Sequence, residues 1–407
     1  MAQAPSNTRL KSARIAAGYN SQQALADALS VGVRQVRRWE SSTPPWPQGE
    51  MAQNLTRLLG QDLQSLGFTP PAGAQADNGR RPGLATAAAI GLAAVPTQAV
   101  IIQPATVAAD FAAVTRAHRR LYWSVAPATL HPAAIAHATL GCALLPETAG
   151  QTRRAVAAAL AETWLLAGRI EFFDLRDADR AQQTLLRALQ AAGEADDPLI
   201  GSAILAHTAF IPAWAGERDA AVERMVAART YARRGPAPAE LLAWLDAVEA
   251  ECETRCGNTR TALHLIGHAE GVLVEGNMHA VPEWLDWFSP VRLAAFKGNT
   301  QLLAGHLPQA RTTLLGVLDE LEKAEEKQST VVLGDLAAVE AAAGDPEAAC
   351  GYARRALDQL ERTWYAMGMD RVRDVRRSLT PHQHEACVRD LDDRLYGWAT
   401  TVSALAR

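Results

Sequence analysis

The pattern of apolar and polar positions over residues 21–40 predicts two short helices joined by a tight turn. In the first helix, Leu25 and Leu29 lie four residues apart and therefore share one face, with alanines beside them that permit close packing. Ser21 stands directly before this helix, where its hydroxyl can cap an orphan backbone N–H group. Residues 30–32 form the predicted turn, and its glycine can cap the helix that follows.

The second predicted helix, residues 33–40, has one apolar stripe and one basic face. Val36 and Trp39 lie three residues apart and point inward. At roughly 100° per residue, Arg34 points almost opposite this stripe, and Arg37 and Arg38 lie well off it. Guanidinium groups bind phosphates and the O6 and N7 atoms of guanine, so this face suits a DNA groove. The alternative interpretation is a solvated basic helix.

Helical patterns also flank this pair. Residues 8–17 and 49–59 have apolar side chains at helical spacing, and a short further helix is expected at 62–66. Five short helices over about 65 residues can bury one small core.

Residues 8–67 resemble the Xre-type, phage-repressor-like helix-turn-helix domain. The matching motifs are SQQALA at 21–26 and VRQVRRWE at 33–40, which includes the hydrophobic-then-Glu ending of that family. The resemblance implies a phosphate contact at Gln22 and base-reading positions at Val33, Arg34 and Arg38. It departs from the family at Gly32, where Ser or Thr is common. The expected DNA-binding residues are Ser21, Gln22, Val33, Arg34, Gln35, Arg37 and Arg38.

Charge is distributed unevenly along the chain. The whole chain has a net charge of −4, of which residues 1–68 contribute +3 and the remainder −7. An acidic body is repelled by phosphates, and the weak basic bias of the N-terminal part favours two copies acting together. Five scattered cysteines show no disulfide framework, which indicates a reducing cytoplasm.

Residues 69–104 separate the two parts of the chain. They begin with a Pro-, Gly- and Ala-rich stretch typical of a flexible linker. Arg80 and Arg81 precede an apolar run, which resembles a twin-arginine export signal. The run is internal and too short to span a bilayer, so we expect a short apolar helix and no membrane association.

Residues 105–407 are expected to be almost wholly helical, with a repeated pattern of glycine, four residues, then alanine. The four copies are Gly216 with Ala221, Gly257 with Ala262, Gly305 with Ala310, and Gly344 with Ala349; residues 177–181 are a degenerate copy. The pattern resembles tetratricopeptide-type helical hairpins, although its period is longer. The alternative is a generic helical domain. The expected fold is therefore all-α, with a helix-turn-helix domain at 1–68, a linker at 69–104 and an α-solenoid at 105–407.

Stacked hairpins form a concave groove that their first helices line. Most large aromatic side chains of this region fall on the helices expected to come first. We expect the ligand-binding residues to be His207, Phe210, Trp214, Trp244, Trp284, Trp287 and Arg292. Aromatic side chains at helical spacing also suit a core, and that alternative stays open.

Motifs for catalysis are weak. His264 and His268 share a helix face and could form half of a metal site, but no further ligand is evident. The sequence has neither a Gly-rich phosphate loop after a strand nor a GxSxG motif. We therefore expect no enzyme, no metal and no cofactor.

Together, the two parts resemble Xre-type regulators that have a tetratricopeptide-like sensor. The resemblance implies a cytoplasmic homodimer that binds double-stranded DNA and responds to a small-molecule or peptide ligand. The alternative is a protein-interaction scaffold in which the helix-turn-helix is not a primary DNA reader.

Overall fold

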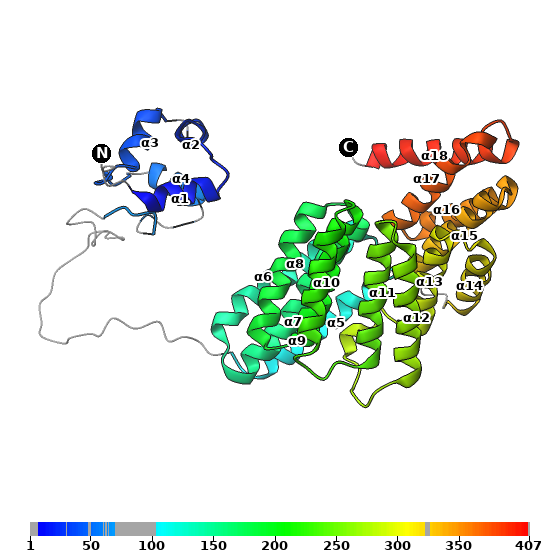
Figure 1. Ribbon diagram of the computed structural model, residues 1–407. Helices are drawn as coiled ribbons and strands as arrows, with labels where there is room; N and C mark the ends of the chain where they lie inside the picture. Colours follow the sequence, from blue (N-terminus) through cyan, green and yellow to red (C-terminus); the bar gives the residue numbers. More distant parts are fainter. Residues whose placement is uncertain are drawn as a thin grey trace, which may run out of the picture. The chain divides into compact units, whose positions relative to one another are not determined.

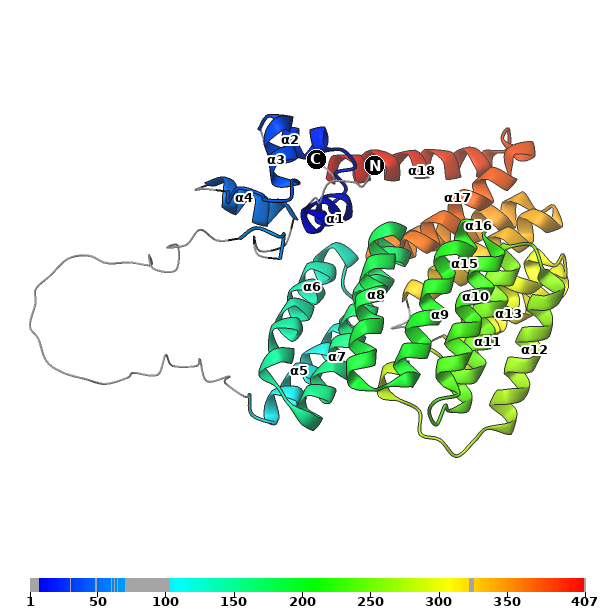
Figure 2. The same ribbon diagram turned by 60° about the vertical axis from the view of Figure 1, so that its left-hand side comes forward.

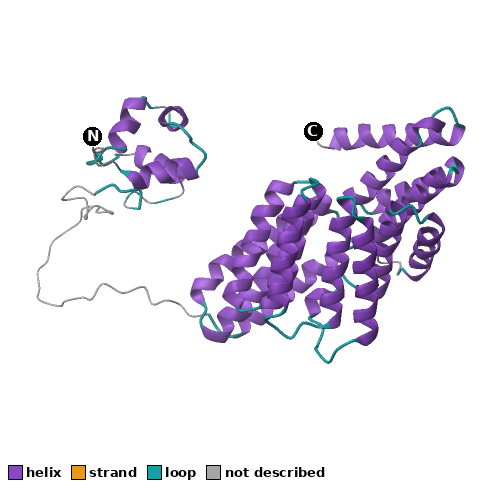
Figure 3. Cartoon of the chain, viewed as in Figure 1, coloured by secondary structure: helices purple, strands orange, loops and turns teal. Residues whose placement is uncertain are grey.

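The protein is all-α in the computed structural model (Figure 1), and no strand occurs among the residues that it describes (Figure 3). These are residues 7–69, without 30, 48–49, 60, 62 and 64, and residues 103–405, without 322–325. The chain divides into two compact units, Met1–Val95 and Pro96–Arg407. The division falls inside the expected linker. The expected short apolar helix and the twin arginines lie outside the described residues.

Four helices occur among the described residues of the N-terminal unit. They are α1 (Thr8–Ala16), α2 (Gln22–Ala28), α3 (Val33–Trp39) and α4 (Glu50–Leu59). The fifth helix expected at 62–66 is wrong, because the described residues of that segment form turns. A segment of five residues closes too few backbone hydrogen bonds to offset the cost of helix nucleation.

The core of the N-terminal unit follows the predicted apolar stripes closely. Leu25, Val36 and Trp39 are buried, as are Leu10 of α1 and Leu55 of α4, each at most 1% exposed. Burying five large apolar side chains supplies most of the driving force for a domain of this size. The alanines expected to allow close packing were Ala24 and Ala28, but the fully buried alanine of α2 is Ala26, and Ala28 is exposed.

The second unit contains the remaining helices. They are α5 (Thr106–Leu121), α6 (Pro127–Leu144), α7 (Gly150–Arg169), α8 (Ala178–Ala195), α9 (Pro198–Trp214), α10 (Arg218–Ala232), α11 (Ala239–Arg255), α12 (Thr259–Glu275), α13 (Pro290–Leu303), α14 (Leu307–Glu320), α15 (Glu326–Ala343), α16 (Pro346–Arg362), α17 (Ala366–Ser378) and α18 (Ala386–Leu405). Short 3₁₀ turns occur at η1 (Leu145–Glu147), η3 (Glu283–Leu285) and η4 (Thr380–His382). A π-helical turn, η2 (Ile170–Asp174), continues α7.

Consecutive helices of the second unit pack as pairs, from α7 with α8 to α15 with α16. The repeated glycines lie between the two helices of a pair and have φ angles of +78° to +83°, which glycine adopts without strain. The repeated alanines lie near the start of each second helix and are at most 1% exposed. At Gly298 of α13, a Cβ atom would lie 2.5 Å from Leu314, so the helices of this pair approach too closely for a side chain there.

The first helices of successive pairs also contact one another. α9 contacts α7 and α11, and α13 contacts α11 and α15. Figures 1 and 2 show the pairs from α7–α8 to α11–α12 side by side in chain order. At the far end α17 contacts η2, which lies near the beginning of this unit. The row of first helices therefore turns back on itself and surrounds an interior space.

One helix has membrane-like length and composition. Residues 127–147, which comprise α6 and η1, are apolar enough to cross a bilayer on those two criteria alone. The same criteria are met by core helices of soluble proteins, and α6 packs against α5 and α7.

Candidate nucleic-acid interface and ligand cavity

Helix α3 presents its arginines to solvent. It begins after its N-cap residue Gly32, which has no side chain to cap the helix. The buried side chains of Val36 and Trp39 hold it against the core of the unit. Arg34, Arg37 and Arg38 are exposed, and none of their guanidinium groups forms an ion pair or hydrogen bond with a described residue. Three guanidinium groups on one short helix are therefore unpaired within the described part of the chain.

A buried ion pair anchors the end of α3 to α1. Arg14 Nε lies 2.7 Å from Glu40 Oε1, and the two side chains are 5% and 7% exposed. Arg14 Nη1 also donates to the backbone oxygen of Tyr19 at 2.6 Å. Gln22 Nε2 donates to Glu40 Oε2 at 2.6 Å, so that one carboxylate connects α1, α2 and α3. The pair fixes α3 against the rest of the unit, a role that the sequence analysis did not assign to Arg14.

The other residues expected to contact DNA lie around the same helix pair. The Ser21 hydroxyl accepts a hydrogen bond from the backbone N–H of Ala24 at 3.1 Å and caps α2, as predicted. Val33 and Gln35 are half-buried on α3. Gln22 is held by Glu40, which leaves its expected phosphate contact a prediction.

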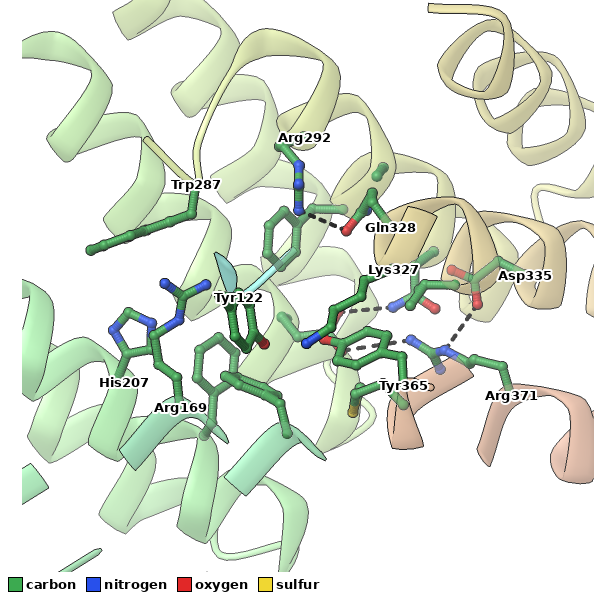
Figure 4. Close-up of a pocket in the computed structure, with 18 of the residues that line it drawn as sticks. Tyr122, Arg169, His207, Trp287, Arg292, Lys327, Gln328, Asp335, Tyr365 and Arg371 are labelled. Atoms are coloured by element: carbon green, nitrogen blue, oxygen red, sulfur yellow. Dashed lines mark hydrogen bonds and ion pairs between the residues drawn. The ribbon is translucent and has the colours of Figure 1, made fainter. Parts of the chain in front are cut away.

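The second unit surrounds a cavity of about 150 Å³. Six of the seven residues expected to bind a ligand line it together: His207, Phe210, Trp214, Trp244, Trp287 and Arg292. They come from α9, α11, the segment before α13, and α13 itself, so the first helices of the pairs supply them. α15 and α17 close the cavity from the other side. In Figure 4, His207 and Trp287 lie on either side of the guanidinium of Arg169, and Arg292 extends toward Gln328.

Trp284 is the exception among the seven. It lies outside the cavity lining, in η3, which precedes α13. Its ring stacks on Trp287 with 5.6 Å between ring centroids and 28° between planes. The expected stack of two indoles is present, but only Trp287 faces the cavity. Trp284 packs against the other side of that ring, outside the cavity lining.

Aromatic rings form one wall of the cavity. His207 lies 5.0 Å from Trp244 and 5.6 Å from Trp287 between ring centroids. Phe210 lies 5.4 Å from Trp214. Burial and the neighbouring charge of Arg169 lower the pKa of His207 to about 3. His207 is therefore neutral at physiological pH and hydrogen-bonds through Nδ1 to the Ala203 carbonyl oxygen at 2.8 Å.

The opposite wall carries ion pairs that join distant parts of the chain. Lys327 Nζ of α15 lies 3.0 Å from Asp174 Oδ1 of η2, and both side chains are at most 1% exposed. Arg371 of α17 lies 3.0 Å from Asp335 of α15. Burial raises the pKa of Asp174 and lowers the pKa of Lys327. The charge of each residue partly offsets the effect of burial on the pKa of the other. Burial also raises the pKa of Asp335 to about 6, against the opposing effect of Arg371.

Arg169, the last residue of α7, faces the cavity and is not in an ion pair, although its charge helps to lower the pKa of Asp174 against the larger effect of burial. Its guanidinium lies over the rings of Trp287 and Tyr122, 4.6 Å and 5.1 Å from their centroids. It forms no ion pair or side-chain hydrogen bond with a described residue, and its Nε atom is shielded from solvent without a partner. The π-helical turn η2 follows directly, a feature often found at functional sites.

Sequence patterns alone did not indicate more than two thirds of the residues that line the cavity. Tyr122, Arg169, Lys327, Asp335 and Arg371 were not among the expected ligand-binding residues. Their chain positions span about 250 residues, and no local spacing connects them. Arg169, which stands in the largely apolar stretch LLAGRIEFF at 165–173, was the available signal, because such residues are rarely buried unless paired.

The chain was compared with known proteins. No protein-family model matches it, and no curated protein is similar to it in sequence.

The described residues do not provide an evident metal site. No group of three or more His, Cys, Asp or Glu side chains among them could hold a metal ion. His268, one half of the weak sequence candidate, instead hydrogen-bonds through Nδ1 to Asp246 at 2.6 Å. What the cavity offers is aromatic surface, paired charges and one unpaired guanidinium.

Proposed function

We propose that the protein is a sequence-specific DNA-binding transcriptional regulator whose DNA binding is modulated by a ligand in its helical second unit. In this proposal the N-terminal unit is an Xre-type helix-turn-helix domain with α3 as recognition helix. The second unit is a tetratricopeptide-like α-solenoid that senses the ligand. The protein acts as a homodimer, because one small domain makes few contacts with DNA and two-fold pairs suit half-sites about one helical turn apart.

The observation that carries the proposal is the division of α3 into a buried and a basic face. Val36 and Trp39 are at most 1% exposed, whereas Arg34, Arg37 and Arg38 are exposed and unpaired among the described residues. Exposed arginines on a helix that is rigidly held suit contacts to phosphates and guanine edges. A merely solvated surface helix would not need the buried ion pair that fixes its end.

The ligand part of the proposal is supported by the cavity of the second unit. Concave sites lined by aromatic side chains with a few polar groups are typical of small-molecule binding. The cavity is bounded by segments from α5 to α17, so a ligand there contacts helices that lie far apart in the chain. A ligand that favours one arrangement of these helices can couple to DNA binding with about 1–3 kcal/mol.

Fluorescence anisotropy with labelled duplexes from the region upstream of the protein's own gene tests DNA binding. If Arg34 reads a base, Arg34→Ala weakens binding to the preferred duplex by about 1–3 kcal/mol and relaxes the base preference at one position of the site. If Arg37 contacts phosphate, Arg37→Ala weakens binding to all duplexes alike and reduces the dependence of the binding constant on salt concentration. Arg260→Ala, which removes an exposed arginine of α12, is the matched control and leaves binding unchanged.

Two outcomes contradict the proposal. If neither Arg34→Ala nor Arg37→Ala alters binding to any duplex, α3 does not read DNA and the scaffold alternative is favoured. Light scattering at micromolar concentration tests the dimer separately. A monomer both with and without DNA contradicts the two-fold arrangement.

A further inference from the structure

Four cationic side chains line the cavity of the second unit: Arg169, Arg292, Lys327 and Arg371. Arg292 donates to Gln328 Oε1 at 3.0 Å. Lys327 pairs with Asp174 at 3.0 Å, and Arg371 pairs with Asp335 at 3.0 Å. The remaining acidic side chain of the lining, Glu251, lies 3.0 Å from the guanidinium of Arg255 on the same helix. The carboxylates of the cavity are therefore already engaged.

The side chain of Arg169 forms neither an ion pair nor a hydrogen bond with a described residue. Its contacts are the faces of Trp287 and Tyr122, and the adjacent His207 is neutral. Ring faces attract a guanidinium, but they do not satisfy its N–H groups. A partly buried cation in this state is unfavourable unless a ligand supplies the missing acceptors.

We propose that the cavity binds a small organic anion with an aromatic body, whose acidic group is held by the guanidinium of Arg169. This inference deepens the proposed function, because it names the chemical class of the ligand that the second unit would sense. A planar guanidinium binds a carboxylate or phosphate through two parallel hydrogen bonds, which gives both affinity and orientation. The rings of Phe210, Trp214 and Trp244 then accept the aromatic body.

The size and chemistry of the cavity favour a small molecule over a peptide. Its volume of about 150 Å³ corresponds to room for about ten ordered water molecules. The lining contains one asparagine, Asn299 of α13, and its Nδ2 already donates to Glu251 at 2.9 Å. This amide donor is therefore not available to a peptide carbonyl, and only Oδ1 of Asn299 has no partner among the described residues.

Isothermal titration calorimetry on the full-length protein without DNA tests the inference. The probes are 1-naphthaleneacetate, 1-naphthyl phosphate and the uncharged 1-naphthaleneacetamide. We expect at least one of the two anions to bind the wild-type protein about 10- to 100-fold more tightly than the amide. The comparison of the two anions tells which acidic group Arg169 prefers.

Variants assign the effect to one side chain. Arg169→Met removes that 10- to 100-fold preference, and Arg169→Lys restores part of it, because the charge returns without the planar fork. The matched control is Arg187→Met on α8. Arg187 is exposed and also lies over an indole, 5.2 Å from the Trp164 centroid, but outside the cavity, so its loss leaves the preference unchanged.

Thermal unfolding separates ligand binding from a structural role. Removing an uncompensated cation leaves the Tm of the ligand-free protein equal or higher, whereas loss of a structural arginine lowers it. The inference is overturned if neither anion binds better than the amide, or if Arg169→Met retains the preference. It is also overturned if Arg169→Met lowers the Tm while Arg187→Met does not. DNA is absent from these measurements, so their failure is distinguishable from a failure of α3 to bind DNA.

Discussion

The two units use arginine in opposite ways. On α3 of the N-terminal unit, three arginines are exposed and unpaired among the described residues. Around the cavity of the second unit, Arg371 is ion-paired, Arg292 hydrogen-bonds to Gln328 at 3.0 Å, and Arg169 lies against aromatic rings. The same side chain is a surface contact group in one unit and part of an enclosed lining in the other.

This difference determines where charge matters for stability. An exposed guanidinium keeps its hydration, so removing it costs little. A buried guanidinium must be satisfied inside the protein, and losing its partner is costly. The N-terminal unit follows both rules, because Arg14 is buried with Glu40 while the α3 arginines remain in water.

The largest expected effect comes from Glu40→Ala. This substitution leaves the Arg14 guanidinium buried without its carboxylate, and arginine cannot neutralise itself by losing a proton. We expect the free energy of unfolding of the N-terminal unit to fall by about 3–5 kcal/mol. Hydrogen exchange followed by mass spectrometry on α1 and α3 peptides of the full-length protein measures the loss.

Two controls sharpen this result. The double variant Arg14→Met/Glu40→Leu removes both charges and should recover most of the lost protection. Glu194→Ala breaks an exposed ion pair in which the side chains of Arg153 and Glu194 are 42% and 50% exposed. It should lower the free energy of unfolding by less than about 1 kcal/mol. Unchanged exchange in Glu40→Ala would show that the buried pair does not hold α3.

An intermediate effect is expected from Asp335 of the second unit, and it depends on pH. Burial raises its pKa to about 6, so the folded protein retains a proton that the unfolded chain releases at lower pH. The contribution of Asp335 to stability therefore falls as pH rises from about 4 to about 6. The variant Asp335→Asn has no titratable group at this position. Its free energy of unfolding minus that of the wild type should therefore increase by about 1–3 kcal/mol as pH rises over this range.

Urea unfolding of the second unit at pH 4.5 and pH 7 measures this change. Any pH-independent effect of altering the partner of Arg371 cancels when the two pH values are compared. Asp319→Asn, which removes an exposed carboxylate of α14, is the matched control for loss of charge. A relative stability of Asp335→Asn that decreases toward pH 7 would mean that the ion pair with Arg371 outweighs the effect of burial.

The smallest effect is expected where the arginines are exposed. Arg38→Ala removes an exposed side chain of α3, so the free energy of unfolding should change by no more than about 0.5 kcal/mol. Hydrogen exchange of the α3 peptides checks this, alongside Glu40→Ala. A large loss of protection would reveal a structural contact of Arg38 and would remove the contrast between the two classes of arginine.

Local pattern in the sequence predicted much of the fold. The spacing of Val36 and Trp39 predicted the buried face of α3, and Ser21 was predicted as the cap of α2. The repeated glycines and alanines predicted where hairpins turn and pack, because left-handed φ angles and close helix contacts need small residues. The helix expected at 62–66 was wrong, because a segment so short depends on its surroundings.

The sequence by itself determined the helices and which of their faces are apolar, since helix periodicity and capping act over a few residues. Only the tertiary structure decided which polar groups meet. Lys327 and Asp174 are 153 positions apart, and Arg169 meets Trp287 only because the row of first helices turns back on itself. Contacts at that separation depend on the summed geometry of every intervening helix pair, which no local pattern encodes.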